Sequence, residues 1–300
     1  MAIRVAVANP KGGVGKSMTT MMVAEGLALH FGARVLVLDM DPQAGVTKLL
    51  LGHRALDDLK SRQVGLGSIL KRWSNGGGIK LAAHCEQASD LIDLRAPRTG
   101  GFIDLVPSNH ELLGELSAFE DAIRQSKRKD RLDVTLAALI DSAVKQIEKH
   151  YHVVLFDCPA GPVALGLASL RCVQHVISPI NLEDNSYTTL KDFLHFILDD
   201  DLGLWSRVTV HPLITMYHAT NPVQRQMLDQ IASGLYGLNA IRRPIPYAAA
   251  LQIAQMHQGP GSYRSQREKY GTALAEVTAL ANAIAERIQL KVSRAPWKTS

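Results

Sequence analysis

The sequence predicts an α/β protein built on a doubly wound, mostly parallel and twisted sheet with helices on both faces. Short apolar runs alternate with helical patterns along its 300 residues, which is typical of repeated strand–helix units. The runs at residues 35–38 and 153–156 are apolar throughout, as expected of parallel strands that are covered on both faces. A glycine-rich loop also joins the first apolar run to the first helical pattern.

The individual elements follow from this alternation. Strands are expected at residues 3–8, 34–39, 102–106, 152–157, 174–179, 208–215 and 240–245. Helices are expected at residues 16–31, 131–149, 163–171, 185–199, 221–234 and 265–289. We find no internal repeat and no long linker, so we expect one domain, residues 1–300, with a C-terminal helix at about 265–290.

The least regular part of the chain is residues 48–101. It contains the turn-rich stretches SNGGG at 74–78 and APRTGG at 96–101, with a short helix expected near 66–73. We interpret this region as an elaborated surface connection. Connections of that length are usually functional or mobile, but the sequence does not indicate the role of this one.

Composition is that of an ordinary globular protein, with 46% hydrophobic and 20% charged residues. The formal net charge of +5 is uneven, because residues 201–300 contain 11 Lys and Arg against 5 Asp and Glu, a net of +6 that leaves about −1 for the first 200. A basic last third fits a surface that faces a polyanion, or simply a solvated face. No apolar run approaches the roughly 18 residues of a membrane span. The three cysteines show neither disulfide nor zinc spacing, and with a strand expected from residue 3 and no signal peptide, we expect a cytoplasmic protein.

The loop at residues 9–17, NPKGGVGKS, carries the most informative motif. A standard Walker A loop, G-x-x-x-x-G-K-[ST], would place glycine at position 10, whereas this chain has Pro10 followed by an additional lysine, Lys11. Glycine backbones can converge on phosphate oxygens, Lys16 would reach the β- and γ-phosphates, and the Ser17 hydroxyl would take one Mg²⁺ position. The helix that begins at Lys16 adds its positive N-terminal dipole. The pattern predicts a nucleotide site formed by Gly12, Gly13, Val14, Gly15, Lys16, Ser17 and Met18.

Two acidic motifs close later strands. Residues 37–43 read VLDMDPQ, and strand alternation turns Asp39 and Asp41 to the same side. Carboxylates at the C-terminal end of a parallel strand border the ligand crevice of such sheets. Residues 151–161 read YHVVLFDCPAG, an apolar strand ending in Asp157, which is the Walker B pattern of an aspartate that holds Mg²⁺ through water.

In this order the motifs resemble those of the ParA/MinD family of ATPases, whose deviant Walker A loop reads K-G-G-x-x-K-[ST], and most of all the ParA/Soj-type partition ATPases. The resemblance also covers FIDLVPS at 102–108, LITMY at 213–217 and PIP at 244–246, so that it spans most of the chain except 48–101. It implies the P-loop NTPase fold of the deviant Walker A type, with ATP and Mg²⁺ as cofactors. Pro246 is then expected near the adenine.

The resemblance also implies roles for the charged residues. Lys11 would cross the interface of an ATP-sandwich homodimer to the partner's phosphates, and with Lys16 and Asp41 it forms the expected catalytic set. Asp41 would orient the attacking water, and Asp39 would serve the Mg²⁺ hydration shell and the switch region. Ser17, Asp39 and Asp157 are therefore the expected metal-site residues. Phosphoryl transfer needs little more, because its catalysis is mostly positioning and charge neutralisation.

Three departures from the family pattern stand out. Met18 replaces the usual threonine whose hydroxyl bonds the α-phosphate, so we expect somewhat weaker nucleotide binding. Pro159 is followed by Ala160 where the family commonly has two prolines. Tyr247 and the alanines at 248–250 stand where relatives carry DNA-binding arginines. Substitutes for that contact, each of which could equally be a solvated surface residue, are Arg225, Arg242, Arg243, Arg264 and Arg267.

The function expected from the motifs and the resemblance is partition or positioning of DNA, either plasmid or chromosome, or of other cargo. The ATP-bound dimer would bind DNA non-specifically on the nucleoid, and a ParB-like or other partner protein would stimulate slow hydrolysis. Because the loop begins within ten residues of the N-terminus, we expect no preceding helix-turn-helix domain.

Two alternatives remain open. One is a MinD-like protein on a membrane, for which residues 288–297 would make a poor anchor helix because of Pro296. The other is a redox or metabolic P-loop enzyme. An iron–sulfur relative would need a second cysteine near Ala164, and Cys158 is better interpreted as a small buried residue.

Overall fold

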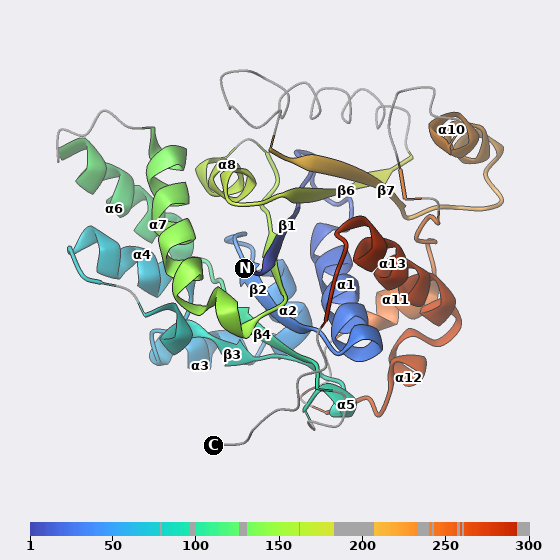
Figure 1. Ribbon diagram of the computed structural model, residues 1–300, viewed down its shortest axis with the longest axis horizontal. Coiled ribbons are helices and arrows are strands. Elements are labelled where there is room, and N and C mark those ends of the chain that lie inside the picture. The colour runs from blue at the N-terminus through green and yellow to red at the C-terminus, as the bar shows by residue number, and fades with distance from the viewer. Residues whose placement is uncertain are drawn as a thin grey trace.

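The protein folds around one seven-stranded sheet (Figure 1). The structure is a computed structural model that describes residues 1–78, 80–95, 100–125, 131–161, 163–182, 207–232, 240–241, 243–256, 259 and 261–292. The strands are β1 (Ile3–Val7), β2 (Arg34–Asp39), β3 (Glu86–Gln87), β4 (Phe102–Val106), β5 (Val153–Asp157), β6 (His175–Asn181) and β7 (Thr209–Thr215). Their order is β3-β4-β2-β5-β1-β6-β7, and only the two-residue β3 pairs antiparallel to its neighbour.

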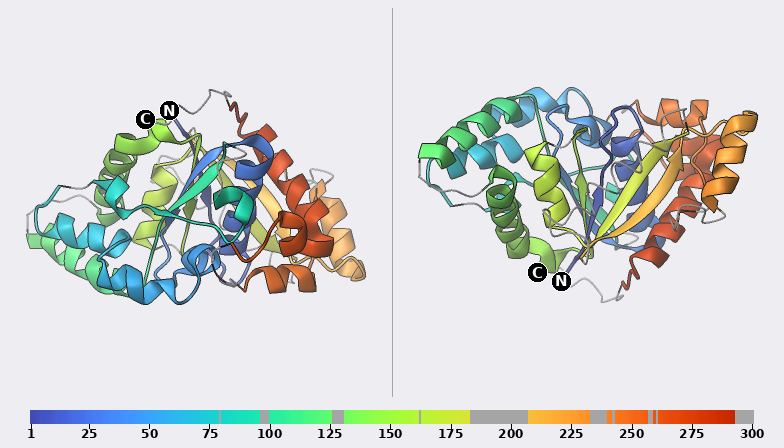
Figure 2. Two further views of the ribbon diagram at one scale, coloured as in Figure 1. Left: turned by 90° about the horizontal axis from the view of Figure 1, so that it is seen from below. Right: turned by 90° about the horizontal axis from the view of Figure 1, so that it is seen from above.

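Helices cover both faces of the sheet (Figure 2). They are α1 (Lys16–Phe31), α2 (Gly45–Leu51), α3 (Ala55–Ser61), α4 (Leu66–Ser74), α5 (Ile92–Arg95), α6 (Glu111–Gln125), α7 (Leu132–Ile147), α8 (Ala164–Arg171), α10 (Pro222–Ala232), α11 (Ala249–Ala254), α12 (Gln266–Tyr270) and α13 (Leu274–Arg287). Short 3₁₀ turns are η1 (Leu81–His84), η2 (Glu148–His150) and η4 (Gly271–Ala273). None of the helices in the described ranges is both long and apolar enough to cross a membrane.

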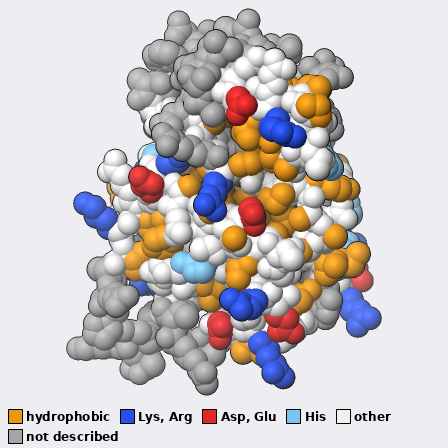
Figure 3. Space-filling view, turned by 90° about the vertical axis from the view of Figure 1, so that its right-hand side faces the viewer, with side chains coloured by type: hydrophobic (Ala, Val, Ile, Leu, Met, Phe, Trp, Pro, Cys, Tyr) orange, Lys and Arg blue, Asp and Glu red, His pale blue; other side chains and the backbone are white. Residues whose placement is uncertain are grey.

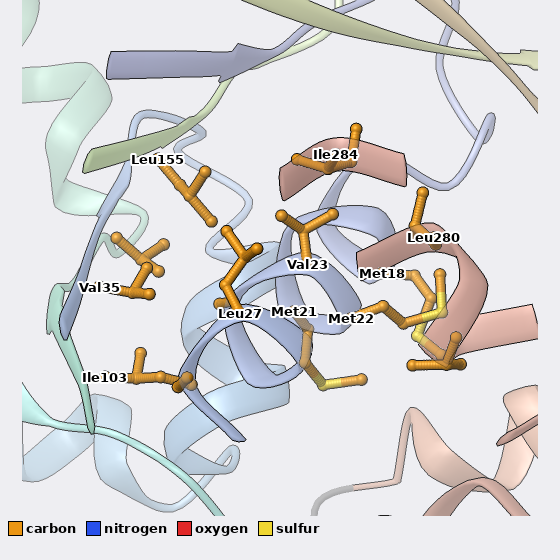
Figure 4. Close-up of a cluster of buried hydrophobic side chains, with 14 of the residues drawn as sticks. Met18, Met21, Met22, Val23, Leu27, Val35, Ile103, Leu155, Leu280 and Ile284 are labelled. Atoms are coloured by element: carbon orange, nitrogen blue, oxygen red, sulfur yellow. The ribbon is translucent and has the colours of Figure 1, made fainter. Parts of the chain in front are cut away.

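Strand alternation divides the core into two layers. Odd positions of β1 and β2, such as Val5 and Val35, join one cluster with α1 and α13, while Ala6 and Leu36 join the other with α4, α7 and α8. Figure 4 shows the first cluster, in which methionine and aliphatic side chains of α1 meet strand residues on one side and α13 on the other. The helices approach closely because α1 has Gly26 there, where an added Cβ would lie 2.4 Å from the Cβ of Ala281.

The predicted doubly wound, mostly parallel fold is confirmed, and the six strands predicted between residues 3 and 215 agree with the observed bounds within two residues. The helix predicted at 265–289 is wrong as one element. It divides into α12, η4 and α13 at Gly271, whose φ of +50° lies outside the helical region. The strand predicted at 240–245 is also wrong, because its described residues contribute only an isolated bridge between Leu213 and Ile241. The helix predicted at 185–199 falls outside the described residues.

The connection at 48–101 is more structured than the sequence suggested. It contains the end of α2, then α3, α4, η1, β3 and α5, and the helix expected near 66–73 is α4. Its second half is tied to the C-terminal part of the chain, because Ile92 donates its backbone N–H to the Tyr263 carbonyl oxygen at 2.9 Å.

Candidate nucleotide-binding site

The glycine-rich loop between β1 and α1 is anchored by the two strands beyond β1. The Asn9 side-chain amide donates to the carbonyl oxygen of Pro179 at 2.8 Å, and its Oδ1 accepts the Lys11 N–H at 2.9 Å. On the other side of the loop, the Thr215 hydroxyl donates to the Val14 carbonyl oxygen at 2.9 Å. Strands β6 and β7 therefore hold the loop in one conformation.

The loop leaves an open concavity above its glycines. Gly13 and Gly15 have φ values of +73° and +85°, in the left-handed region that favours glycine. A Cβ added to Gly12 or Gly13 would meet nothing within 4 Å. Both residues are exposed, so their backbone is accessible to a ligand, and Gly15 forms the N-terminal cap of α1. A loop of this shape at a helix N-terminus is suited to binding phosphate.

The Lys16 ammonium lies inside this loop. Its side chain is buried, and Nζ donates to the carbonyl oxygens of Asn9 and Lys11 at 3.1 and 3.0 Å. Burial lowers its pKa, and the charges of Asp157 and Asp41 partly offset that effect. The positive charge of Lys16 is thus fixed inside the loop that surrounds the concavity.

Asp157, at the end of β5, is buried and bonded to the first turns of α1. Its two carboxylate oxygens accept hydrogen bonds from the hydroxyls of Ser17 at 2.7 Å and Thr20 at 2.8 Å. Burial raises the pKa of Asp157 to about 6, against these hydrogen bonds and with a further upward contribution from Asp41. The predicted metal-site residues Ser17 and Asp157 are in direct contact.

Asp39, at the end of β2, is equally buried and lies beside Asp157 in the strand register. Its Oδ2 accepts hydrogen bonds from both the N–H and the hydroxyl of Thr47, at 3.0 and 2.6 Å. The Thr47 hydroxyl in turn accepts the Ser108 N–H at 3.0 Å. Burial, followed by the charge of Asp157, raises the pKa of Asp39 to about 8.

The donor set of this corner fits Mg²⁺. Two buried carboxylates and one hydroxyl present oxygen ligands, which Mg²⁺ prefers. The charge of Asp157 makes ionisation of Asp39 more costly by like-charge repulsion. A divalent cation beside them would remove that cost. The α2 backbone also approaches closely here, because a Cβ on Gly45 would lie 2.4 Å from the Ser17 Oγ.

Asp41 stands at the same edge, on the turn between β2 and α2. Its side chain is half-buried, and Oδ1 accepts the Gln43 N–H at 2.8 Å while its own N–H donates to Asp39 at 3.1 Å. Its charge contributes to the pKa shifts of both Lys16 and Asp157. The predicted catalytic residues Lys16 and Asp41 therefore border one site, and Lys11 belongs to the loop that surrounds it.

An apolar pocket of about 210 Å³ adjoins the start of α1. Pro246 reaches it because the chain after residue 243 runs beside the end of β7, with the N–H of Tyr247 donating to the Tyr217 carbonyl oxygen at 3.0 Å. Met18 and Met22 of α1 and Leu251 of α11 supply much of the remaining wall. The structure thus brings Met18 and Pro246, far apart in sequence, into one pocket next to the phosphate loop.

The arginines predicted to contact DNA are not gathered in one place. Arg225 lies on α10, Arg243 precedes the Pro244–Pro246 segment, and Arg264 and Arg267 lie at α12; all four are exposed. Helices α10 and α12 stand at opposite ends of the right-hand side of Figure 1, and Figure 3 shows Lys and Arg scattered among acidic side chains on that face. Arg242 lies outside the described residues. A DNA contact through these arginines stays a prediction.

Several functional side chains were missed by the sequence analysis. Thr20 follows Ser17 by one helical turn, so the i, i+3 spacing on one face could have suggested it. Asn9 directly precedes the loop and could have been read as its anchor. No local signal points to Thr47 or Thr215, because their partners lie eight and about two hundred residues away.

Comparison with known proteins supports the reading of the motifs. A family model described as an AAA domain matches residues 2–200. The chromosome-partitioning ATPase Soj of Thermus thermophilus is 28% identical over 232 residues, covering 76% of this chain and 75% of Soj. A putative replication protein A of Sinorhizobium fredii is 27% identical over 234 residues, covering 75% of this chain. The chain spans only 52% of the length of that longer relative.

Two solved structures share the fold. A putative plasmid partition protein of Borrelia burgdorferi bound to AMPPNP matches with a TM-score of 0.66 at 17% identity, covering 95% of this chain and 99% of that one. Cobyrinic acid a,c-diamide synthase of Mycobacterium smegmatis, with bound ATP analogue and magnesium, matches with a TM-score of 0.68 at 23% identity, covering 96% and 94%. At these identities the likeness establishes the fold alone.

Proposed function

We propose that this chain, which belongs to the family of AAA domains whose model matches residues 2–200, is a Mg²⁺-dependent ATPase of the ParA type that partitions DNA or positions other cargo. The observation that carries the proposal is the meeting of Lys16, Ser17 and Asp157 at one edge of the sheet, beside an open phosphate loop. The similarity to Soj and to a plasmid partition protein supports the partition role.

The proposed chemistry is hydrolysis of ATP to ADP and phosphate. Mg²⁺, when bound, neutralises charge on the phosphates. Ser17 and Asp157 would hold that ion, and the buried Asp39 behind them would act on its water shell. Lys16 would bind the phosphates, and Asp41 would orient the water that attacks the γ-phosphorus as the bond to ADP breaks.

The adenine would occupy the apolar pocket beside Met18 and Pro246. Its walls are preformed by α1, α11 and the segment after residue 243, and apolar walls suit the faces of a planar base. Met18 supplies a wall of this pocket in place of a hydroxyl for the α-phosphate. The loss of one hydrogen bond to a charged group, about 1.5–3 kcal/mol, would then be partly offset by contact with the base.

The switch in this proposal is a dimer that ATP completes. Lys11 would serve the phosphates of a second subunit, a role that its place on the loop beside the open glycines allows. The dimer would bind DNA without sequence preference through phosphate contacts, which places the protein on the nucleoid. A partner protein would stimulate hydrolysis and so release the dimer.

A DNA gel shift with ATP, ADP or no nucleotide, repeated across salt, tests the proposal. We expect binding with ATP only, weakening steeply with salt because phosphate contacts release counterions. Light scattering should show an ATP-dependent dimer that Lys11→Ala abolishes and that Asp41→Ala traps. Lys149→Ala, an exposed lysine on η2 at the opposite edge, is the matched control. Nucleotide-independent DNA binding, or an unchanged dimer in Lys11→Ala, would refute the proposed switch.

A further inference from the structure

The connection at 48–101 forms a second, polar pocket that the proposed ATPase reaction does not use. Its volume is about 390 Å³, within the range of about 300–1,000 Å³ of small-molecule sites. Its walls come from α3, α4, η1 and the start of α6. Helices α4 and α6 and the turn η1 pack on the face of the sheet opposite to α1. The side chains with charge or a titratable ring that line it are Lys60, Arg62, Lys71, Arg72, His84, Glu111 and Glu115.

The pocket is built onto the end of β4. Leu66 at the start of α4 donates its N–H to the Pro107 carbonyl oxygen at 2.9 Å. Gly65 makes this approach possible, because its φ is +118° and a Cβ there would lie 2.5 Å from the same oxygen. One wall is therefore fixed to the sheet, at the same carboxyl edge as the nucleotide site.

The lining is arranged for an anion. Four cations and two carboxylates line the pocket. Arg62 already pairs with Asp58 and Glu86 outside the lining, but within the described residues Arg72 forms no ion pair. The two pairs between lining residues are weak: Lys60 and Glu111 meet at 2.9 Å but are 61% and 51% exposed, and Lys71 lies 3.8 Å from Glu115. Exposed pairs contribute little, so an incoming anion could replace these carboxylates.

His84 supplies a fixed donor. The side chain is only 5% exposed, and Nδ1 accepts the Gly65 N–H at 3.3 Å. Burial, together with the charge of Arg72, lowers its pKa, so the ring is neutral near pH 7. With Nδ1 accepting, the proton of the neutral ring is on Nε2.

We propose that this pocket binds a small ligand bearing a carboxylate or phosphate group, held by Arg72, Lys71 and His84, and that its occupancy is coupled to the nucleotide site. Coupling has a physical route. Asn109 lines the pocket and caps α6 through the Glu111 N–H at 3.0 Å. Its neighbour Ser108 donates to the Thr47 hydroxyl, which donates to Asp39. The coupling rests on the proposed function, but binding in the pocket does not.

Titration of the full chain with succinate and, separately, inorganic phosphate tests the site, with Mg²⁺ and ADP present to fill the phosphate loop. Amide NMR should show saturable shifts at residues 62–72 and 84, and the better of the two probes identifies the ligand's charged group. Arg72→Gln should weaken binding about tenfold, since a hydrogen-bonded ion pair to a small anion is lost. Lys149→Gln, an exposed lysine outside the pocket, should change it less than twofold.

A gain of affinity sharpens the test. Glu111→Gln keeps the backbone donor to Asn109 but removes the internal competitor for Lys60. It should tighten binding about threefold, the order expected from one exposed charge pair. No saturable shift up to about 10 mM, where even a site with a Kd of about 1 mM would be mostly filled, overturns the proposal. Equal losses in Arg72→Gln and Lys149→Gln overturn it too, because they would mean non-specific attraction.

The coupling is tested by measuring ATP affinity with and without the bound probe. We expect a change of about fivefold, with an equal reciprocal change in probe affinity. Thr47→Val removes the linking hydroxyl and should abolish that change while leaving the pocket shifts intact. Unchanged ATP affinity in the wild type refutes the coupling. A protein that binds the probe but no ATP refutes the proposed function and leaves the pocket standing.

Discussion

Helix α1 passes two buried clusters of charged side chains that differ in their counter-ions. At its start, Asp39 and Asp157 lie side by side, and neither forms an ion pair among the described residues. Near its middle, Glu25 and Asp90 are as deeply buried but share the ammonium of Lys269, at 2.7 Å from each. Burial opposes the charge of Lys269, yet the two carboxylates more than offset it and raise its pKa.

The presence or absence of a cation distinguishes a cluster that stabilises the fold from a candidate ligand-binding site. The Lys269 cluster contains its own cation, which joins α1, α12 and the segment before α5. Burial raises the pKa of Glu25, but the charge of Lys269 counters that rise. The carboxylate pair has no such cation within ion-pair distance among the described residues, and its pKa values rise to about 8 and about 6. Buried charge without a partner is costly unless a ligand supplies the partner. We infer that the Lys269 cluster exists for stability and the carboxylate pair for a cation that arrives with nucleotide.

The largest effect should follow from removing the cation of the Lys269 cluster. Lys269→Met leaves Glu25 and Asp90 buried without a partner, and the free energy of unfolding should fall by about 3–5 kcal/mol. Urea unfolding measures this, with the exposed Lys149→Met as the control. A loss below about 1 kcal/mol, the value of an exposed pair, would show that the two clusters do not differ in the way we infer.

The carboxylate pair should respond in the opposite sense. Asp157→Asn keeps an acceptor for the Thr20 hydroxyl and removes one of two adjacent negative charges. Without ligand, the variant should be at least as stable as the wild type at pH 7. With Mg²⁺ and a non-hydrolysable ATP analogue at a hundred times its Kd, the wild type should gain about 2.7 kcal/mol, and the variant should lose most of that gain. An apo protein destabilised like Lys269→Met would contradict the distinction.

The sequence predicted the carboxylate pair but not the Lys269 cluster, and the reason is physical. Phosphate and Mg²⁺ binding depend on short stretches of backbone with a particular geometry. The loop at residues 9–17 and the two aspartates at strand ends can therefore be recognised from neighbouring residues in the sequence. Lys269 looks like one more charged residue of a helix, and its partners are 179 and 244 positions away. The division of the C-terminal helix had only one local sign, Gly271.

The connection at residues 48–101 likewise contains features that the sequence did not predict because they depend on distant residues. Its helix α4 was expected, but β3 has two residues and gains its form only by pairing with β4. The polar pocket joins four elements that no periodicity links. Lys11 and Asp41 were given roles from resemblance, and the arginines were suggested as substitutes for the family's DNA contact. Apart from Arg242, which lies outside the described residues, the structure shows where they lie without testing what they do.

A buried ionisable group can also be accommodated in its neutral form, as at His211. Burial, with His175 at 3.2 Å and Arg287 at 3.4 Å, lowers its pKa to about 4. In the unfolded state this histidine binds a proton near pH 6.5, whereas in the native state it does so only near pH 4. The free energy of unfolding should therefore fall as pH drops from about 6.5 to about 4. His211→Gln should lessen that fall by about 1–2 kcal/mol, because His175 retains part of it. Unfolding at several pH values measures this, and parallel profiles would contradict it.

The smallest effect is expected where pairing occurs without burial. Arg124 and Glu120 meet at 2.6 Å on α6, closer than either contact of Lys269, but their side chains are 71% and 39% exposed. Arg124→Ala should therefore cost no more than about 0.5 kcal/mol, and added salt should remove most of the difference. Arg124→Lys controls for side-chain packing. A loss above 1 kcal/mol would mean that the distance between paired charges, and not their burial, decides how much a pair stabilises the fold. The inference that Asp39 and Asp157 form a cation site would then have no basis.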